Sequence, residues 1–267
     1  MKTLEQFSLA ARRAIAGVFT DIDDTLTNEG RLKAEAYTAM QRLQAAGLLV
    51  VPITGRPAGW CDHIARMWPV DAVVGENGAF YFRYDAKARK LQKRFLMDEA
   101  TRAANRRKLV AIRERVLKEV PGAGIASDQL YREADLAIDF CEDVPPLPDA
   151  AIDRIIRIFE EAGATAKASS IHVNGWFGSY DKLGMTQMLM RESFGVDLDG
   201  QRENYVFAGD SPNDQPMFAY FPHSVGVANV ADMLNRISSP PGYVTRGRGG
   251  DGFAELADAL IAARAGR

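Results

Sequence analysis

AGVFTDIDDTLT, residues 16–27, is the stretch of sequence that decides the fold. Its first five residues are mostly apolar and predict a short buried strand, and three carboxylates follow within four positions. Two unit charges about 4 Å apart interact by about 4 kcal/mol at an effective dielectric near 20, so these acids require a cation or a proton. We interpret the stretch as part of a catalytic or metal site. A solvated acidic turn or a helix cap remains the alternative for Asp24 and Thr27.

Strands and helices alternate around this stretch. A helical pattern at residues 32–46 leads to an apolar strand at 48–53, and a helical pattern at 58–67 leads to a third short strand at 72–74. The same alternation of helices and strands resumes at residue 181, with strands predicted at 205–208 and 224–227. Alternation of this kind predicts an α/β fold, a doubly wound parallel sheet with helices on both faces.

The alternation is interrupted between residues 84 and 179. This segment begins with a charged stretch at 85–94 and contains two helical patterns and four short strand patterns. The helical patterns are at 98–120 and 150–162, and the strands are at 130–132, 136–140, 164–168 and 171–173. We therefore predict a core made of residues 1–83 and 180–267, with an inserted α+β domain at 84–179.

Composition narrows the possible partners and location. The 267 residues include 33 basic and 35 acidic residues, well mixed, so no global field favours nucleic acid or an anionic membrane. No stretch approaches the roughly 18 apolar residues that span a bilayer. The two cysteines, Cys61 and Cys141, form no CxxC pair and favour a reducing compartment. We expect a cytoplasmic protein without nucleic-acid or membrane partners, and nothing in the sequence indicates an oligomeric state.

A second acidic segment also follows an apolar strand. It reads Gly209-Asp210-Ser211-Pro212-Asn213-Asp214. Because the carboxyl ends of parallel strands converge at one crevice, Asp210 and Asp214 can meet Asp21 and Asp23 in space. Their oxygens would form the environment that Mg²⁺ prefers. Asp214 alone could equally be a first-turn residue that stabilises a helix dipole.

Candidate phosphate ligands lie at other strand ends and helix starts. Thr54, Gly55 and Arg56 follow the strand at 48–53, so the Thr54 hydroxyl and nearby amides can hold phosphate. Lys182 opens a helix, where a cation is unfavourable for the dipole and invites a functional explanation. A solvated surface lysine is the alternative for Lys182. Asn213, beside the second acidic segment, is a further candidate phosphate ligand.

The four segments, in this order and spacing, resemble the four motifs of the haloacid dehalogenase (HAD) superfamily, specifically its phosphatases. The resemblance implies a HAD-like, Rossmannoid core. The insert resembles in position the larger type of cap found in Cof-like, sucrose-phosphate and mannosyl-phosphoglycerate phosphatases. The segment Glu76-Asn77-Gly78-Ala79 is similar to a loop common in that branch.

The resemblance also implies a role for each motif residue. Asp21 would attack phosphorus, and Asp23 would be the general acid and base. Thr54 and Lys182 would hold the phosphoryl group. The magnesium ion would be bound by Asp210, Asp21 and the Asp23 carbonyl, with Asp214 as a nearby acid. An acid two residues after the nucleophile separates the phosphatases of this superfamily from its dehalogenases, and this sequence has it.

The expected activity is Mg²⁺-dependent hydrolysis of a small phosphorylated metabolite, a sugar phosphate or phosphoglycerate derivative by analogy. Arg56, Asn77, His172 and Asn174 are candidate substrate contacts. A strand surface with alternating polar positions explains His172 and Asn174 equally well. A phosphomutase would use the same aspartyl phosphate, and a non-catalytic binding module on this fold is a third possibility.

Overall fold

The computed structural model describes residues 1–265. Its central sheet has six strands in the order β1-β15-β14-β13-β2-β5, and every neighbouring pair is parallel. The strands are β1 (Lys2–Thr3), β2 (Gly17–Thr20), β5 (Leu49–Pro52), β13 (Tyr205–Gly209), β14 (His223–Gly226) and β15 (Tyr243–Val244). The predicted α/β class and doubly wound sheet are confirmed, although the sequence did not indicate β1.

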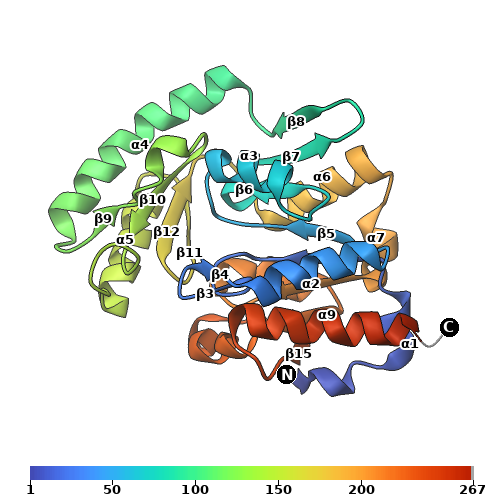
Figure 1. Cartoon of the computed structure of the whole chain (residues 1–267). Coiled ribbons are helices and arrows are strands. Elements are labelled where there is room, and N and C mark those ends of the chain that lie inside the picture. The colour runs from blue at the N-terminus through green and yellow to red at the C-terminus, as the bar shows by residue number, and fades with distance from the viewer. Residues whose placement is uncertain (266–267) are drawn as a thin grey trace.

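Helices cover both faces of this sheet because its strands are apolar on both sides. Val18 and Val50 pack with α2 (Ala34–Ala45), α3 (Ala58–Met67) and α9 (Gly249–Ala265). Phe19 and Val51 point to the opposite face, toward α6 (Lys182–Phe194), α7 (Leu198–Gln201) and α8 (Gln215–Tyr220). Figure 1 shows α2 and α9 side by side on one face, with α1 (Leu9–Ala14) near the end of α9. The acids that follow β2 therefore emerge from a rigid two-sided core.

A hairpin extends the core at the side of β5. β6 (Val73–Gly75) lies parallel to β5 through a bridge between Ile53 and Val74. It pairs antiparallel with β7 (Phe80–Asp85), which in turn pairs antiparallel with β8 (Lys90–Phe95). Side chains of β7 and β8, among them Phe82 and Phe95, pack on the core cluster. The predicted boundary at residues 83 and 84 falls inside β7, so by these contacts we propose that the core ends between β8 and α4.

The inserted cap is a four-stranded sheet with two helices on one face. Its strands have the order β11-β12-β10-β9, all antiparallel, and α4 and α5 lie on its outer side in Figure 1. Leu136, Ile138 and Val173 point to these helices. The elements are α4 (Glu99–Glu119), β9 (Gly124–Ile125), β10 (Asp135–Asp139), α5 (Asp149–Glu161), β11 (Thr165–Ala168) and β12 (His172–Trp176). The other sheet face, which carries Asn174, is turned to the core.

The strand predicted at residues 130–132 is wrong. Gln129–Tyr131 form a short 3-10 turn, and Leu130 is 94% exposed. The Gln129 side chain bonds the carbonyl of Asp135 and the amide of Ala137, which satisfies the edge of β10 that a strand would have paired. The apolar residues here mark an exposed turn rather than a sheet.

Two short strands, β3 (Thr27–Asn28) and β4 (Arg31–Leu32), form a hairpin directly after the first acidic motif.

Within residues 1–265, no helix combines the length and the apolar character that crossing a bilayer requires.

Candidate active site

Three acids from the two predicted segments lie together at the carboxyl ends of adjacent strands. Asp21 follows β2, Asp210 follows β13, and these strands pair in parallel. Asp21, Asp210 and Asp214 each offer an oxygen, and these oxygens all lie within 4.8 Å of one another. All three side chains are buried. Such a cluster of carboxylate oxygens can hold a divalent cation.

Lys182 is buried beside these acids rather than solvated at the surface. Its Nζ lies 2.9 Å from an Asp21 oxygen and 2.7 Å from an Asp214 oxygen. Burial by itself lowers the pKa of Lys182, but the two carboxylates outweigh it and raise that pKa above its usual value. The first residue of α6 thus supplies a fixed positive charge to the site.

Burial raises the pKa of Asp21 to about 8, and the neighbouring Asp214 and Asp23 act in the same direction against the opposing Lys182. Burial also raises the pKa of Asp210 well above its usual value, with Asp214 and Asp21 adding to the effect. Asp210 accepts hydrogen bonds from Thr25 Oγ1 at 3.0 Å and from Asn229 Nδ2 at 3.4 Å, both neutral donors. The cluster therefore carries more carboxylates than the single lysine can balance.

Both oxygens of Asp214 already have protein partners. Oδ1 accepts from Lys182, and Oδ2 accepts from the amides of Asp210 and Ser211 at 3.0 and 3.3 Å. These bonds fix the loop after β13 and the lysine at the same time. We infer that Asp214 holds the site together. Each Asp210 oxygen accepts from one neutral donor only, so Asp21 and Asp210 are better placed than Asp214 to bind a cation.

The side chain of Asp23 points away from this cluster and toward the cap. Arg56 donates to Asp23 from Nη2 at 2.8 Å and from Nε at 3.0 Å. The same guanidinium donates to Glu142 at 2.6 Å and to Asp128 at 3.3 Å, both cap residues. It also lies 4.4 Å from the centre of the Trp60 ring. Arg56 therefore joins the predicted general acid to two carboxylates of the cap.

This network gives a stability prediction. In Arg56→Met, Asp23 and Glu142 lose their arginine partner, and Asp128 keeps only Arg132, so we expect about 3 kcal/mol less unfolding free energy. Chemical denaturation measures this loss. The matched control is Arg66→Met on α3, because its ion pair with Asp62 is exposed and is worth about 1 kcal/mol or less. Equal losses in the two variants would show that Arg56 does not hold the cap.

The predicted phosphate ligands lie around a tight turn after β5. Thr54 is buried, and its Oγ1 accepts from the Arg56 amide at 3.0 Å. A Cβ on Gly55 would lie 3.1 Å from Asn77 Nδ2, so the close approach of these two loops favours glycine. Asn213 donates to Asn77 Oδ1 at 3.3 Å. The structure thus brings Thr54, Gly55, Asn77 and Asn213 together. Phosphate binding by Thr54, Gly55 and Asn213 and substrate contact by Asn77 stay predictions.

The two predicted substrate contacts on the cap have partners within the cap. His172 Nε2 lies 2.9 Å from a Glu142 oxygen, and Asn174 donates to Asp135 at 2.9 Å. Burial opposes ionisation of Glu142, yet its bonds to His172 and Arg56 outweigh burial and lower its pKa to about 2. His172 and Asn174 face the core, and their contact with substrate stays a prediction.

Two buried charged residues at the junction of core and cap were not predicted from the sequence. Glu76 accepts hydrogen bonds from the amides of Ala58 in the core and of Glu133 and Ala134 in the cap, at 2.6 to 3.0 Å. Arg132 pairs with cap acids and donates to the Gly55 carbonyl at 2.8 Å. The sequence signal that could have identified Glu76 is the position of a glutamate directly after the apolar strand β6.

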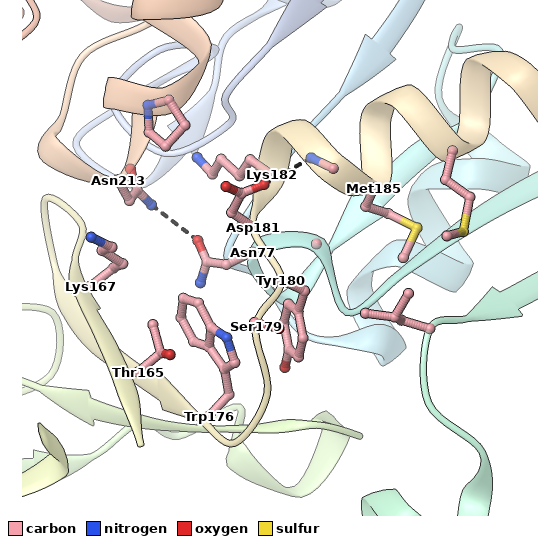
Figure 2. A pocket seen from close by; sticks show the side chains of 15 residues that line it. Asn77, Thr165, Lys167, Trp176, Ser179, Tyr180, Asp181, Lys182, Met185 and Asn213 are labelled. Carbon is pink, nitrogen blue, oxygen red and sulfur yellow. Dashed lines mark hydrogen bonds between the residues drawn. The ribbon is translucent and has the colours of Figure 1, made fainter. Parts of the chain in front are cut away.

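Cavities between core and cap lie beside the site in different directions. One of about 520 Å³ is lined by Lys182, Asn77 and Asn213 from the core and by residues of β11 and β12, as Figure 2 shows. Another of about 340 Å³ is lined by Asp23 and Arg56 and by the cap loop with Glu142. A small substrate therefore has space on both sides of the interface.

Comparison with known proteins finds one matching family model. Residues 18–105, which carry the first two motifs, match the family model of haloacid dehalogenase-like hydrolases. The match covers about a third of the chain. Together with relatives that are named phosphatases, it confirms the predicted resemblance to this superfamily and the predicted enzyme class, a hydrolase.

The hydrolase has named relatives over nearly its whole length. It is 24% identical over 261 residues to a phosphoglycolate phosphatase of Methanobrevibacter smithii, covering 92% of this chain and 99% of the relative. The C-terminal domain of trehalose-6-phosphate phosphatase from C. albicans has the same fold, with a TM-score of 0.71, 13% identity and coverage of 98% and 97%. The sucrose-phosphatase of Synechocystis sp. PCC6803 has a TM-score of 0.63, 15% identity and coverage of 94% and 98%.

Proposed function

We propose that this hydrolase is a magnesium-dependent phosphatase that cleaves a small phosphate monoester through a phosphorylated Asp21. The observation that carries the proposal is the contact of Asp21 with Lys182 inside a buried cluster that also contains Asp210. A carboxylate is a weak nucleophile toward an anionic ester, so it requires fixed positive charge beside it. The phosphatase names of the relatives support the same reaction.

The chemistry follows from the positions of the side chains. An Asp21 oxygen attacks phosphorus and the ester P–O bond breaks, while Asp23 gives a proton to the leaving oxygen. Lys182 offsets the charge of the phosphoryl oxygens, and the turn at Thr54 and Gly55 supplies further donors. A water molecule then attacks phosphorus and loses a proton to Asp23, which releases inorganic phosphate and regenerates the Asp21 carboxylate. The cap excludes bulk water.

The acids of the site fit a magnesium ion. Their donor atoms are oxygens only, which suits Mg²⁺ better than softer metals. The negative charge of the three carboxylates exceeds the single positive charge of Lys182. Asp21 and Asp210 would hold the ion, together with the predicted Asp23 carbonyl. When bound, the ion would neutralise the phosphoryl oxygens and allow two anions to approach.

Metal binding gives a prediction that is independent of turnover. We expect Asp210→Asn to weaken Mg²⁺ binding at least about tenfold, measured by titration calorimetry, because the cluster loses a charged oxygen ligand. The control is Asp232→Asn, since Asp232 lies near the same face but is exposed and paired with Arg248. If both variants bound Mg²⁺ like the unchanged protein, Asp210 would not be a ligand.

The names of the relatives indicate a substrate class, and the cysteines indicate a location. Sugar phosphates and phosphorylated short acids are the candidates, because the relatives and fold neighbours are named for phosphoglycolate, sucrose and trehalose phosphate. A cytoplasmic location is supported by the two free cysteines. A screen of phosphate release across sugar phosphates, phosphorylated acids and nucleotides with Mg²⁺ tests the function. Absence of phosphate release from every ester, in folded protein, would contradict it.

A phosphomutase remains the second candidate, because it would use the same Asp21 and Asp23 chemistry and return the phosphoryl group to another hydroxyl. An isomerised sugar phosphate without released phosphate would replace the hydrolase proposal. A non-catalytic module is disfavoured by the family match and by the presence of every motif acid.

A further inference from the structure

One cavity between core and cap lies beside the proposed nucleophile. It has a volume of about 520 Å³, and Lys182, which contacts Asp21, forms part of its wall. In Figure 2, Thr165, Lys167 and Trp176 of the cap lie across the cavity from Asn77 and Asn213 of the core. The leaving group of a phosphate ester that is bound beside Asp21 could therefore reach the cap through this space.

Lys167 differs from the other cations at this interface. Arg56 is surrounded by three carboxylates, Arg132 is paired with two, and Lys182 is paired with two. Lys167 is exposed, and it has no ion-pair or hydrogen-bond partner within residues 1–265. Its positive charge is available to a ligand, whereas that of Arg56 is already balanced.

The register of the cap sheet aims Lys167 at the core. Lys167 pairs with Asn174, and Thr165 pairs with Trp176, in neighbouring strands β11 and β12. Paired residues share a face of the sheet, and Val173, one residue before Asn174, points to the helices on the other face. The pleat of the sheet therefore holds Lys167 toward the cavity without any partner.

Asn77 adds a second unpaired donor to the same cavity. Ser211 donates to Asn213 Oδ1, and Asn213 Nδ2 donates to Asn77 Oδ1, so this chain of bonds orients the Asn77 amide. Among the residues that the structure describes, Asn77 Nδ2 is then left without a partner, although Asn77 is only 2% exposed. Figure 2 shows this nitrogen on the cap side of the amide, facing away from Asn213. Buried donors without partners are costly unless a ligand satisfies them.

We propose that this cavity binds a carboxylate carried by the leaving group of the substrate, with Lys167 as the residue that selects for it. The proposal rests on the phosphatase function and narrows its substrate to short phosphorylated hydroxy acids. A cation and a donor without partners suit an anionic acceptor better than a neutral sugar, whose hydroxyl groups need acceptors as well. A single free lysine matches the single charge of a carboxylate.

The test compares two esters with the same carbon skeleton, 3-phosphoglycerate and glycerol 3-phosphate. The first carries a carboxylate at the carbon where the second carries a hydroxymethyl group. We expect kcat/KM to favour 3-phosphoglycerate in the unchanged protein. In Lys167→Gln, the ratio of the two values should fall about tenfold to hundredfold, mainly through KM of the acid. Lys167→Arg should recover part of the ratio because it keeps the charge.

The matched control is Lys118→Gln, which removes an exposed lysine of α4, a helix packed on the outer face of the cap sheet; it should keep the ratio. Release of phosphate from p-nitrophenyl phosphate reports on the core chemistry separately. If that ester is hydrolysed but Lys167→Gln leaves the ratio unchanged, the carboxylate site is wrong and the phosphatase proposal stands. If no ester is hydrolysed with Mg²⁺ present, both proposals are wrong.

Discussion

Asp21→Asn is expected to lower kcat by at least about 10⁴-fold, because the amide cannot attack phosphorus and no other group can form the intermediate. Folding should survive the change. Asp21 is a buried carboxylate whose pKa is raised to about 8, so a neutral amide removes an unfavourable charge. Lys182 keeps Asp214 as its partner at 2.7 Å. Phosphate release and thermal unfolding, measured on the same preparation, check both parts.

The control for this variant is Asp197→Asn, which makes the same chemical change at an exposed position before α7. It should keep full activity. Retained turnover in purified Asp21→Asn would contradict the assignment of the nucleophile, and unfolding of that variant would contradict the reasoning about its buried charge.

Asp23→Asn is expected to lower kcat by about 10²-fold to 10⁴-fold, the usual contribution of a general acid and base. The size of the loss should depend on the leaving group. An alkyl phosphate needs a proton on its leaving oxygen, whereas p-nitrophenolate leaves without one. The rate of phosphoryl transfer from the nitrophenyl ester to Asp21 should therefore fall less than the rate from the alkyl ester. Single-turnover measurements on both esters separate this effect from the second step.

Asp24→Asn is the matched control, because Asp24 has a φ of 55°, a conformation that asparagine tolerates well. It should change kcat by less than about threefold. If Asp23→Asn affected both esters equally, Asp23 would be acting through Arg56 and the cap instead of by proton transfer.

The core and its acids could be predicted from sequence because local rules determine them. The strand before Asp21 and the strand before Asp210 are short apolar runs, and parallel strands place the residues at their carboxyl ends along one edge of the sheet. Lys182 was predicted from its position at a helix start, where a lysine is unfavourable for the dipole. These inferences need no knowledge of how the cap is docked.

The contacts between cap and core could not be predicted because they join residues far apart in the chain. Arg56 meets Glu142, and Arg132 meets the Gly55 carbonyl, only when the cap sheet faces the core. The hairpin β7–β8 was assigned to the cap because residues 85–94 are charged, yet an exposed edge hairpin on a core sheet is charged as well. The turn at Leu130 was mistaken for a strand because its apolar side chains suggested burial.

The most direct test of the central claim is to trap the phosphorylated enzyme. The protein is mixed with a substrate and Mg²⁺, quenched in acid within milliseconds, reduced with borohydride and digested for peptide mass spectrometry. A phosphorylated aspartate is reduced to homoserine, so we predict homoserine at position 21 and none at Asp23 or Asp210. Homoserine at another aspartate, or an unmodified Asp21 while phosphate is released in a burst, would contradict the account.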